Sequence, residues 1–248
     1  MRYFFEVSYH GKNYHGWQRQ NNAISVQQVL EEALALLTGI DNIVITGSGR
    51  TDTGVHCRQQ YFHAEIEKGI DCNKLQYNLN SYLPEDISIN SIFAVNEEAH
   101  ARFSAVSRSY EYHVSKTKTP FFKDMSHVYV KPLDITTMNE AATLLIGDKD
   151  FEAFSKVKTD VNNFNCDITY ARWEEDENFY VFHISANRFL RGMVRAIVGT
   201  LFQIGMGKMS VDQFAEIIES KDRRNAGAAA PAKGLFLTRV NYPDDIVN

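Results

Sequence analysis

The spacing of apolar residues constrains the fold of this chain more than any other feature. Some stretches alternate apolar and polar side chains with the period of two that strands show, and others have the wider spacing of an amphipathic helix. The first helix carries its own end signals, since Ser25 and Gln28 form a capping box and Gly39 follows the last turn. In the first half, strands are expected at 3–9, 42–47, 59–66 and 87–95, and helices at 25–38 and 73–83.

The second half of the chain has a similar succession of strand and helix patterns. Strands joined by hairpins as well as by helices favour mixed or antiparallel sheets. We therefore predict an α+β protein of two halves, each a mixed or antiparallel sheet with helices, and halves of this kind often fuse their sheets. The domain boundary is expected near residue 105, giving domains 1–105 and 106–248. In the second half, strands are expected at 109–114, 128–130, 168–175, 179–186 and 234–240, and helices at 136–146, 189–205 and after Ser210.

Composition and charge exclude several classes of protein. The 248 residues are 44% apolar and 23% charged, without an apolar run of transmembrane length or a signal-peptide pattern, so a cytoplasmic globular protein is expected. Three scattered cysteines argue against a disulfide framework and against a structural zinc site. The net charge of −5 argues against a protein that coats nucleic acid, but local basic clusters remain. They are Arg188, Arg191 and Arg195, and Lys221, Arg223 and Arg224.

The stretch GSGRTDTGVHCR at residues 47–58 contains Asp52-Thr53-Gly54, the triplet of aspartic proteases. That chemistry needs two carboxylates sharing a proton, and the chain has no second triplet of this kind. Two interpretations of the segment around Asp52 remain. In the first, the glycines form a tight turn and Asp52 caps a backbone amide. In the second, Arg50 and Asp52 point the same way from an extended segment, and the glycines let a ligand approach.

Histidine and cysteine residues give weaker signals. His10 and His15 lack metal-ligand helical spacing and have no acidic residue nearby. His56 and Cys57 are adjacent, but neighbouring residues of a strand point to opposite faces, which argues against a thiol–imidazole pair.

Two further groups of residues each have a structural and a functional interpretation. Arg191 and Arg195 are four residues apart within the expected helix 189–205. They form either a solvated stripe or a pair in which Arg195 reaches a carboxylate. Tyr110 and Tyr112 share a strand face with Arg108 and serve either as core aromatics or as a surface for stacking on a base.

Several strings together resemble a known family. The stretch GRTDTGVH at 49–56 is similar to the signature Gly-Arg-Thr-Asp-x-Gly-Val-His of TruA-type tRNA pseudouridine synthases. Supporting strings lie before and after the signature, in the family's order, and the resemblance spans nearly the whole chain. Cys57 departs from the commonest pattern, in which a small residue such as Ala follows the signature, and it brings a thiol close to the site. The supporting strings are SVQ (25–27), RSYEYHV (108–114), FLRGMVRAIVGTL (189–201) and APAKGLFLTRVNYP (230–243).

The resemblance implies a fold, an activity and roles for residues. The fold would be α+β, with two similar α/β-sandwich halves related by a pseudo-twofold, a fused, mostly antiparallel central sheet and flanking helices. The Asp52 loop would lie in 1–105, and 106–248 would complete the RNA-binding cleft. A cytoplasmic homodimer would bind tRNA and convert uridines at tRNA positions 38 to 40, in the anticodon stem-loop, to pseudouridine without a metal or organic cofactor. Asp52 would be the catalytic nucleophile, paired with Arg195. Arg50 would help to displace the target nucleotide, and Tyr110 would pack against its base.

The chemistry of the residues is compatible with this role. An ionised carboxylate can attack C1′ or C6 or assist a glycal route, and the sequence does not choose among these. A base inside a stem must first be flipped out. Phosphate contacts would fall to the basic clusters, including Arg188 and Arg191. Two other hypotheses stay open, a non-catalytic RNA-binding protein on the same scaffold and a hydrolase that uses a lone Asp.

Overall fold

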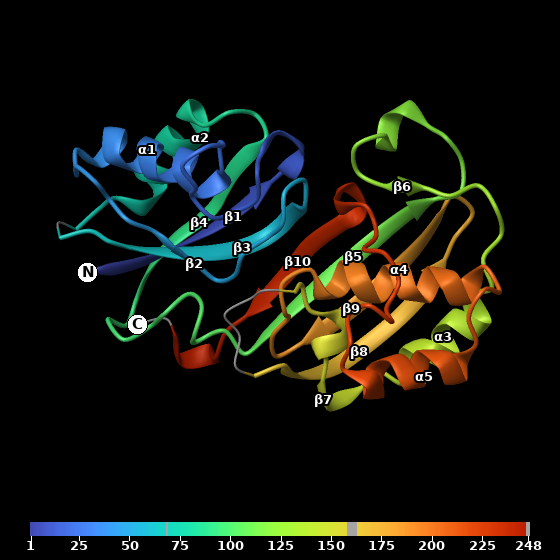
Figure 1. Cartoon of the computed structure of the whole chain (residues 1–248). Coiled ribbons are helices and arrows are strands. Elements are labelled where there is room, and N and C mark those ends of the chain that lie inside the picture. Colours follow the sequence, from blue (N-terminus) through green and yellow to red (C-terminus); the bar gives the residue numbers. More distant parts are fainter. Residues whose placement is uncertain (68, 158–162, 247–248) are drawn as a thin grey trace. The chain divides into compact units, whose positions relative to one another are not determined.

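The computed structural model describes residues 1–67, 69–157 and 163–246, and the chain forms two compact units (Figure 1). Unit 1 comprises residues 1–107 together with 237–248, and unit 2 comprises residues 108–236. The division into domains 1–105 and 106–248 stays a prediction.

Unit 1 is built on a sheet with the strand order β4-β1-β3-β10, in which β1 pairs antiparallel with both β3 and β4. Strand β2 is short and pairs with one end of β3, so that the loop after β2 starts at a fixed point on the sheet. The expected strand 42–47 is therefore too long, because only its last two residues join the ladder. The strands are β1 (Arg2–Tyr9), β2 (Thr46–Gly47), β3 (His56–Glu65), β4 (Ile87–Val95) and the unit 1 part of β10 (Leu235–Asn241).

Helices α1 (Val26–Thr38) and α2 (Cys72–Tyr82) contact each other, and α2 packs against β4 (Figure 1). The side chain of Ser25 accepts the Gln28 N–H at the start of α1, and Gly39 ends the helix with a φ of 70°. Such a cap contributes about 1 kcal/mol to the stability of a helix. The predicted start and end of the first helix are confirmed.

The sheet of unit 1 has buried residues on both faces. Strand β1 has Phe5 and Val7 buried on one face and Phe4 fully buried on the other. The second face is covered from the C-terminal end of the chain, because Tyr242 packs its ring against Phe4 and donates a hydrogen bond to the Ala101 carbonyl. This packing makes the last residues of the chain part of unit 1.

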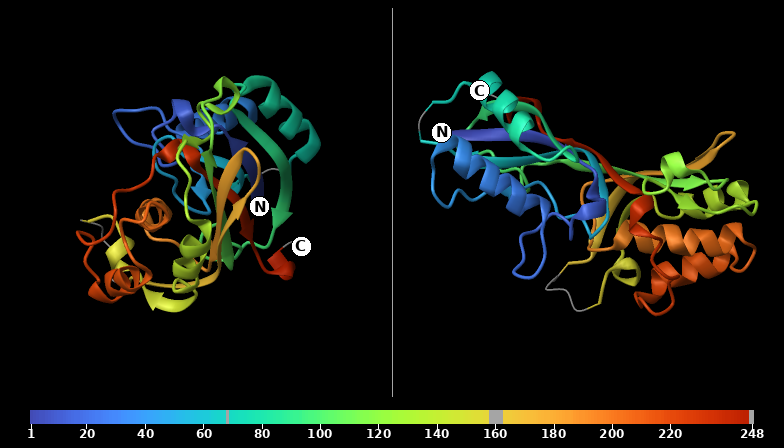
Figure 2. Two further views of the ribbon diagram at one scale, coloured as in Figure 1. Left: turned by 90° about the vertical axis from the view of Figure 1, so that its right-hand side faces the viewer. Right: turned by 90° about the horizontal axis from the view of Figure 1, so that it is seen from above.

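Unit 2 is built on strands in the order β5-β9-β8-β7, all paired antiparallel, with β6 added to β5 in parallel. Its helices pack together, since α3 contacts α4, α5 and β8, and the views in Figures 1 and 2 show α4 and α5 running alongside each other. The strands are β5 (Ser107–Ser115, in unit 2 from Arg108), β6 (His127–Val128), β7 (Gly147–Asp150), β8 (Asn165–Glu175) and β9 (Phe179–Ala186). The helices are α3 (Ile135–Thr143), α4 (Met193–Gly205) and α5 (Val211–Ser220).

The expected helix 189–205 is wrong at its N-terminal end. Gly192 takes a left-handed conformation, with a φ of 72°, and helix α4 begins only at Met193. Arg191 therefore precedes the helix, and it does not share a helix face with Arg195. By contrast, Ser210 and Gln213 form the predicted capping box of α5.

The predicted α+β class, with a large, mostly antiparallel sheet and flanking helices, is confirmed. Within the described residues, every helix is too short or too polar to cross a membrane.

Candidate functional site

The loop that carries Asp52 joins β2 to β3 and is held to the protein by backbone contacts at both ends. Ser48 donates its N–H to the Tyr61 carbonyl at 2.7 Å, and Gln60 donates its side-chain amide to the Gly49 carbonyl at 3.2 Å. Further along, Trp17 donates its N–H to the Thr51 carbonyl at 3.3 Å. The backbone on both sides of Asp52 is thus fixed by the sheet and by the segment around Trp17.

Asp52 itself begins a tight turn. The N–H of Val55 donates to the Asp52 carbonyl at 3.1 Å, and Gly54, the third residue of the turn, has a φ of 78°. A positive φ at this position is the requirement of a type II turn, which favours Gly. Gly54 also donates its N–H to the Tyr14 carbonyl at 3.3 Å. The glycine of the triplet is therefore needed by the backbone itself.

Two other glycines let the segment before α1 approach the Asp52 loop. A Cβ atom on Gly11 would lie 1.9 Å from the Val55 carbonyl oxygen, and one on Gly16 would lie 2.4 Å from the Thr51 carbonyl oxygen. Any larger residue would push the two segments apart. The sequence gives no sign of this contact, because the stretch HGKNYHGW looks like an ordinary polar loop.

The other glycines of the GSGRTDTGVHCR stretch have different roles. A Cβ on Gly47 would lie 2.5 Å from the Trp17 ring, so this glycine makes room for a core side chain. Gly49 faces open space, with nothing within 4 Å of the position that a Cβ would take. Of the glycines expected to admit a ligand, Gly47 is filled by the Trp17 ring, whereas Gly49 leaves space free of protein atoms on that side.

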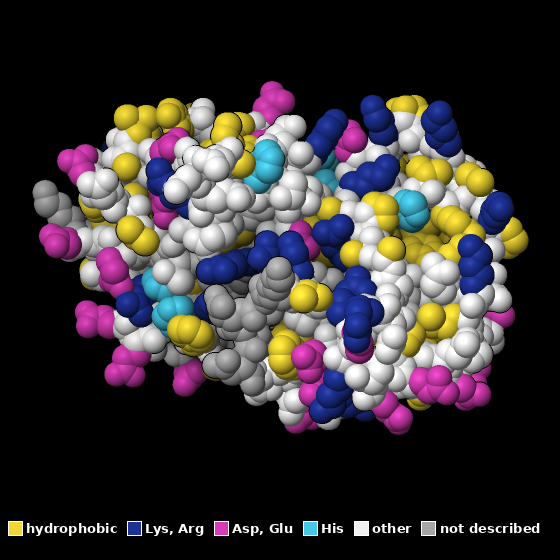
Figure 3. Space-filling model, in the orientation of Figure 1, with side chains coloured by type: hydrophobic (Ala, Val, Ile, Leu, Met, Phe, Trp, Pro, Cys, Tyr) yellow, Lys and Arg dark blue, Asp and Glu magenta, His cyan; other side chains and the backbone are white. Residues whose placement is uncertain are grey.

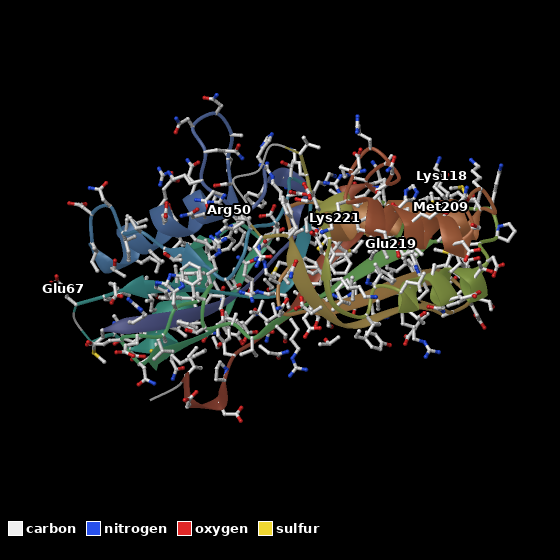
Figure 4. The ribbon with its side chains drawn as sticks, turned by 60° about the horizontal axis from the view of Figure 1, so that its bottom comes forward. Arg50, Glu67, Lys118, Met209, Glu219 and Lys221 are labelled. Atoms are coloured by element: carbon white, nitrogen blue, oxygen red, sulfur yellow. The ribbon has the colours of Figure 1, made fainter. Side chains whose placement is uncertain are left out.

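The side chains around Asp52 differ in exposure. Arg50 is exposed, and its Nε donates to Gln18 at 3.1 Å; it is labelled in Figure 4. Thr51 is buried, and its hydroxyl lies 2.8 Å from that of Tyr9. Asp52 is half-buried. This arrangement leaves Arg50 at the surface while Thr51 anchors the loop in the core.

His56 and Cys57 are both buried and structural. His56 accepts the Gly11 N–H at its Nδ1 atom at 3.1 Å, so its proton belongs on Nε2. Burial raises the pKa of the Cys57 thiol well above its ordinary value. Since the thiolate is the reactive form, the thiol that the sequence brings near the site is unreactive.

In unit 2, Tyr110 and Tyr112 lie on one face of β5, as the alternation predicts. Tyr110 is half-buried, and its ring makes an edge contact with Phe189 at 5.2 Å between centroids. Tyr112 is fully buried and donates its hydroxyl to the Pro231 carbonyl at 2.9 Å. Tyr112 is thus a core residue, and Tyr110 is the one of the pair with exposed surface.

Arg195 is held by the loop before β10. Its Nε donates to the Ala230 carbonyl at 2.7 Å, and the Ala230 N–H donates back to the Arg195 carbonyl at 2.9 Å. Its positive charge partly opposes the burial that raises the pKa of Tyr112, which places the guanidinium near that ring. The small residues of the loop therefore allow its backbone to come close enough for a carbonyl to accept a hydrogen bond from Arg195.

That close approach depends on Gly199 in α4. A Cβ there would lie 1.8 Å from the Ala228 carbonyl oxygen. Next to it, Thr200 accepts the Gly227 N–H at 2.9 Å while donating its hydroxyl to the Ala196 carbonyl. The loop lies directly on the helix at this point.

Arg188 and Arg191 lie in the connection from β9 to α4. Arg188 is half-buried, near Cys166, and its charge partly opposes the burial that raises the pKa of that thiol to about 11. Arg191 is exposed. A third cation comes from the start of β5, where Arg108 donates to the Asn187 carbonyl at 2.8 Å. The sequence indicates Arg108 only as a neighbour of the tyrosines, because its closeness to residue 187 depends on the pairing of β5 with β9.

The basic cluster after α5 is largely neutralised. Lys221 forms an ion pair with Asp150 at 2.8 Å, and Arg224 pairs with Asp222. Lys221 and Glu219, both at the C-terminal end of α5, are labelled in Figure 4. These paired cations are weaker candidates for phosphate contacts than the exposed Arg191.

Within the described part of the chain, no group of three or more His, Cys, Asp or Glu side chains is placed to hold a metal ion.

Comparison with known proteins places the chain in a family. The family model described as tRNA pseudouridine synthase matches residues 7–104 and 141–243. The chain belongs to the tRNA pseudouridine synthase family. A relative from Bacteroides fragilis named tRNA pseudouridine synthase A is 47% identical, over 99% of this chain and 98% of its own. Relatives of the same name from Parabacteroides distasonis and Streptococcus thermophilus are 46% and 40% identical, over 99% and 98% of this chain and 97% and 99% of theirs. The predicted family is therefore confirmed over nearly the full length.

Proposed function

We propose that the protein is an isomerase that converts uridines at positions 38 to 40 of the tRNA anticodon stem-loop to pseudouridine, with Asp52 as nucleophile. The observation that carries the proposal is the family signature, which lies on a loop fixed by backbone contacts on both sides of Asp52. Family membership supports the reaction and the class of RNA.

The reaction rearranges one nucleotide without a change in mass. The N1–C1′ bond breaks, the base turns, a C5–C1′ bond forms, and the proton on C5 is lost while N1 gains one. A carboxylate assists by attack on C1′ or C6 or by removing a proton on a glycal route, and each route requires ionised Asp52. A loop fixed in place serves this purpose, because a nucleophile must be held within a fraction of an ångström of its target.

The partners of Asp52 are assigned from the matching positions of the family. Arg195 supplies a guanidinium that keeps the carboxylate ionised in a desolvated site. The two residues belong to different units, so their pairing rests on the resemblance and on this chemistry. Tyr110 packs against the base and has the exposed surface to do so. Arg50 is exposed and assists in displacing the nucleotide from its stem.

Phosphate contacts are assigned to Arg188 and Arg191 in the connection before α4, joined by Arg108. The protein is proposed to act as a cytoplasmic homodimer.

Mapping of pseudouridine in tRNA tests the proposal. We expect tRNA from cells lacking the protein to lose pseudouridine at positions 38 to 40 only, and a copy of the wild-type chain to restore it. A copy carrying Asp52→Ala is expected not to restore it. Unchanged pseudouridine in the deletion strain would reject the function. Restoration by Asp52→Ala would reject the nucleophile.

The same strains and their tRNA distinguish the proposal from the two other hypotheses. A hydrolase would change the mass of the tRNA, whereas isomerisation leaves it unchanged. A non-catalytic RNA-binding protein would be supported if Asp52→Ala restored growth of the deletion strain as well as wild type does.

A further inference from the structure

The segment that joins β5 to α3 carries a concentration of positive charge that the proposed site does not use. Residues 116–131, here called the lysine segment, read KTKTPFFKDMSHVYVK. It has four lysines and one acidic residue, a net charge of 4 − 1 = +3 in a chain whose net charge is −5. Figure 3 shows Lys and Arg side chains interspersed with hydrophobic ones over the part of unit 2 that contains β6. A local basic surface of this kind indicates an anionic partner.

Three of these four lysines form no ion pair with any residue that the structure describes. Lys116 is the exception. It forms an ion pair with Glu175, and its Nζ lies 4.5 Å from the centroid of the Tyr180 ring. Lys118, Lys123 and Lys131 are exposed and, among the described residues, form no ion pair; Lys118 is labelled in Figure 4. Their charges are therefore available to a partner.

An aromatic ring stands among these lysines on an ordered turn. Phe121 is 83% exposed. Its neighbour Phe122 packs its ring against Phe179 at 5.0 Å, and the Phe122 carbonyl accepts hydrogen bonds from Met125 at 3.1 Å and Ser126 at 2.9 Å. The turn is thus anchored by Phe122, and Phe121 is held at the surface. Lysines beside an exposed aromatic ring are the combination that binds single-stranded nucleic acid, by phosphate contact and base stacking.

The lysine segment begins beyond the C-terminal end of β5, past Tyr110, the residue assigned to the target base. Tyr110 is five residues before Ser115 on β5, a separation of about 17 Å along an extended strand. We propose that the lysine segment is a second RNA-binding surface, which contacts tRNA outside the anticodon stem-loop. Lys118 and Lys123 bind phosphates there, and Phe121 stacks on an unpaired base. This inference rests on the proposed function for its choice of RNA.

Two double variants with matched chemistry test the surface. Lys118→Gln with Phe121→Ala removes one lysine and one exposed ring from the segment. Lys74→Gln with Tyr77→Ala is the control. It removes one lysine and one exposed ring from α2, where Tyr77 is 73% exposed. The dissociation constant of each protein is measured for full-length tRNA and for the isolated anticodon stem-loop, at several salt concentrations and beside pseudouridine formation.

We expect the segment variant to bind full-length tRNA about tenfold more weakly and the stem-loop as wild type does. The salt dependence for full-length tRNA should lose about one unit of slope. The α2 variant should match wild type on both RNAs. Equal weakening on both RNAs, or none on either, would overturn the inference. Dissociation of an oligomer by the segment variant would instead assign the surface to a second copy of the chain. If the wild-type protein forms no pseudouridine, the proposed function is rejected. The second surface is still tested, because the binding comparison does not require turnover.

Discussion

Replacement of Gly199 by Ala tests the arrangement that holds Arg195. The added Cβ would lie 1.8 Å from the Ala228 carbonyl oxygen, whereas ordinary contacts begin at 3.4 Å. The loop must therefore recede by 3.4 − 1.8 = 1.6 Å. This movement breaks both the Gly227–Thr200 hydrogen bond and the one from Arg195 to Ala230.

The two hydrogen bonds set the size of the effect. A neutral hydrogen bond contributes about 1 kcal/mol and one from a charged donor about 2 kcal/mol. We expect Gly199→Ala to lower the free energy of unfolding by about 3 kcal/mol, measured by urea denaturation. Because a displacement of about 1 Å in a positioning contact can cost about 100-fold in rate, kcat for pseudouridine formation should fall by that order.

Gly69→Ala provides the control. It adds the same methyl group at a position with nothing within 4 Å, so a change within about 0.5 kcal/mol is expected. Wild-type stability and kcat in Gly199→Ala would refute the claim that this close approach positions Arg195. Lost stability with an unchanged kcat of the folded protein would refute the link to catalysis.

Two further predictions concern buried groups. His63 accepts the Ala101 N–H, and burial, with the nearby Arg2, lowers its pKa to about 4 from 6.5. Neutral His63 therefore stabilises the fold above pH 6.5, and this contribution is lost as the pH falls toward 4. Urea denaturation should show about 2 kcal/mol more loss between about pH 7.5 and pH 5 in wild type than in His63→Gln, and equal losses would contradict the assignment. Cys57 should resist iodoacetamide in the native protein while the partly exposed Cys72 reacts, and alkylation of both at one rate would show that Cys57 is accessible.

Local signals in the sequence predicted local structure well. Ser25, Gly39 and Ser210 mark helix ends because capping depends on residues a few positions apart. The start of α4 was missed for an equally local reason, since Gly192 adopts a positive φ inside a run of apolar residues that otherwise suits a helix.

Contacts between distant segments were not predictable. Nothing in the sequence pairs Gly11 and Gly16 with the Asp52 loop, or Gly199 with the loop before β10, because these glycines matter only after the segments meet. The candidate residues stood out in the sequence, the resemblance gave them their roles, and the structure adds the contacts that fix the backbone of the Asp52 loop and the position of Arg195. It also separates Tyr112, a core residue, from Tyr110, which keeps exposed surface.

The most direct test of the central claim is tritium release from tRNA that contains 5-tritiated uridine, with wild type and Asp52→Asn compared. The substitution removes the negative charge and keeps the size of the side chain. The account predicts that wild type releases tritium from the anticodon stem-loop and that Asp52→Asn slows release at least about 1,000-fold, with tRNA affinity nearly unchanged. Release by Asp52→Asn at the wild-type rate would contradict it.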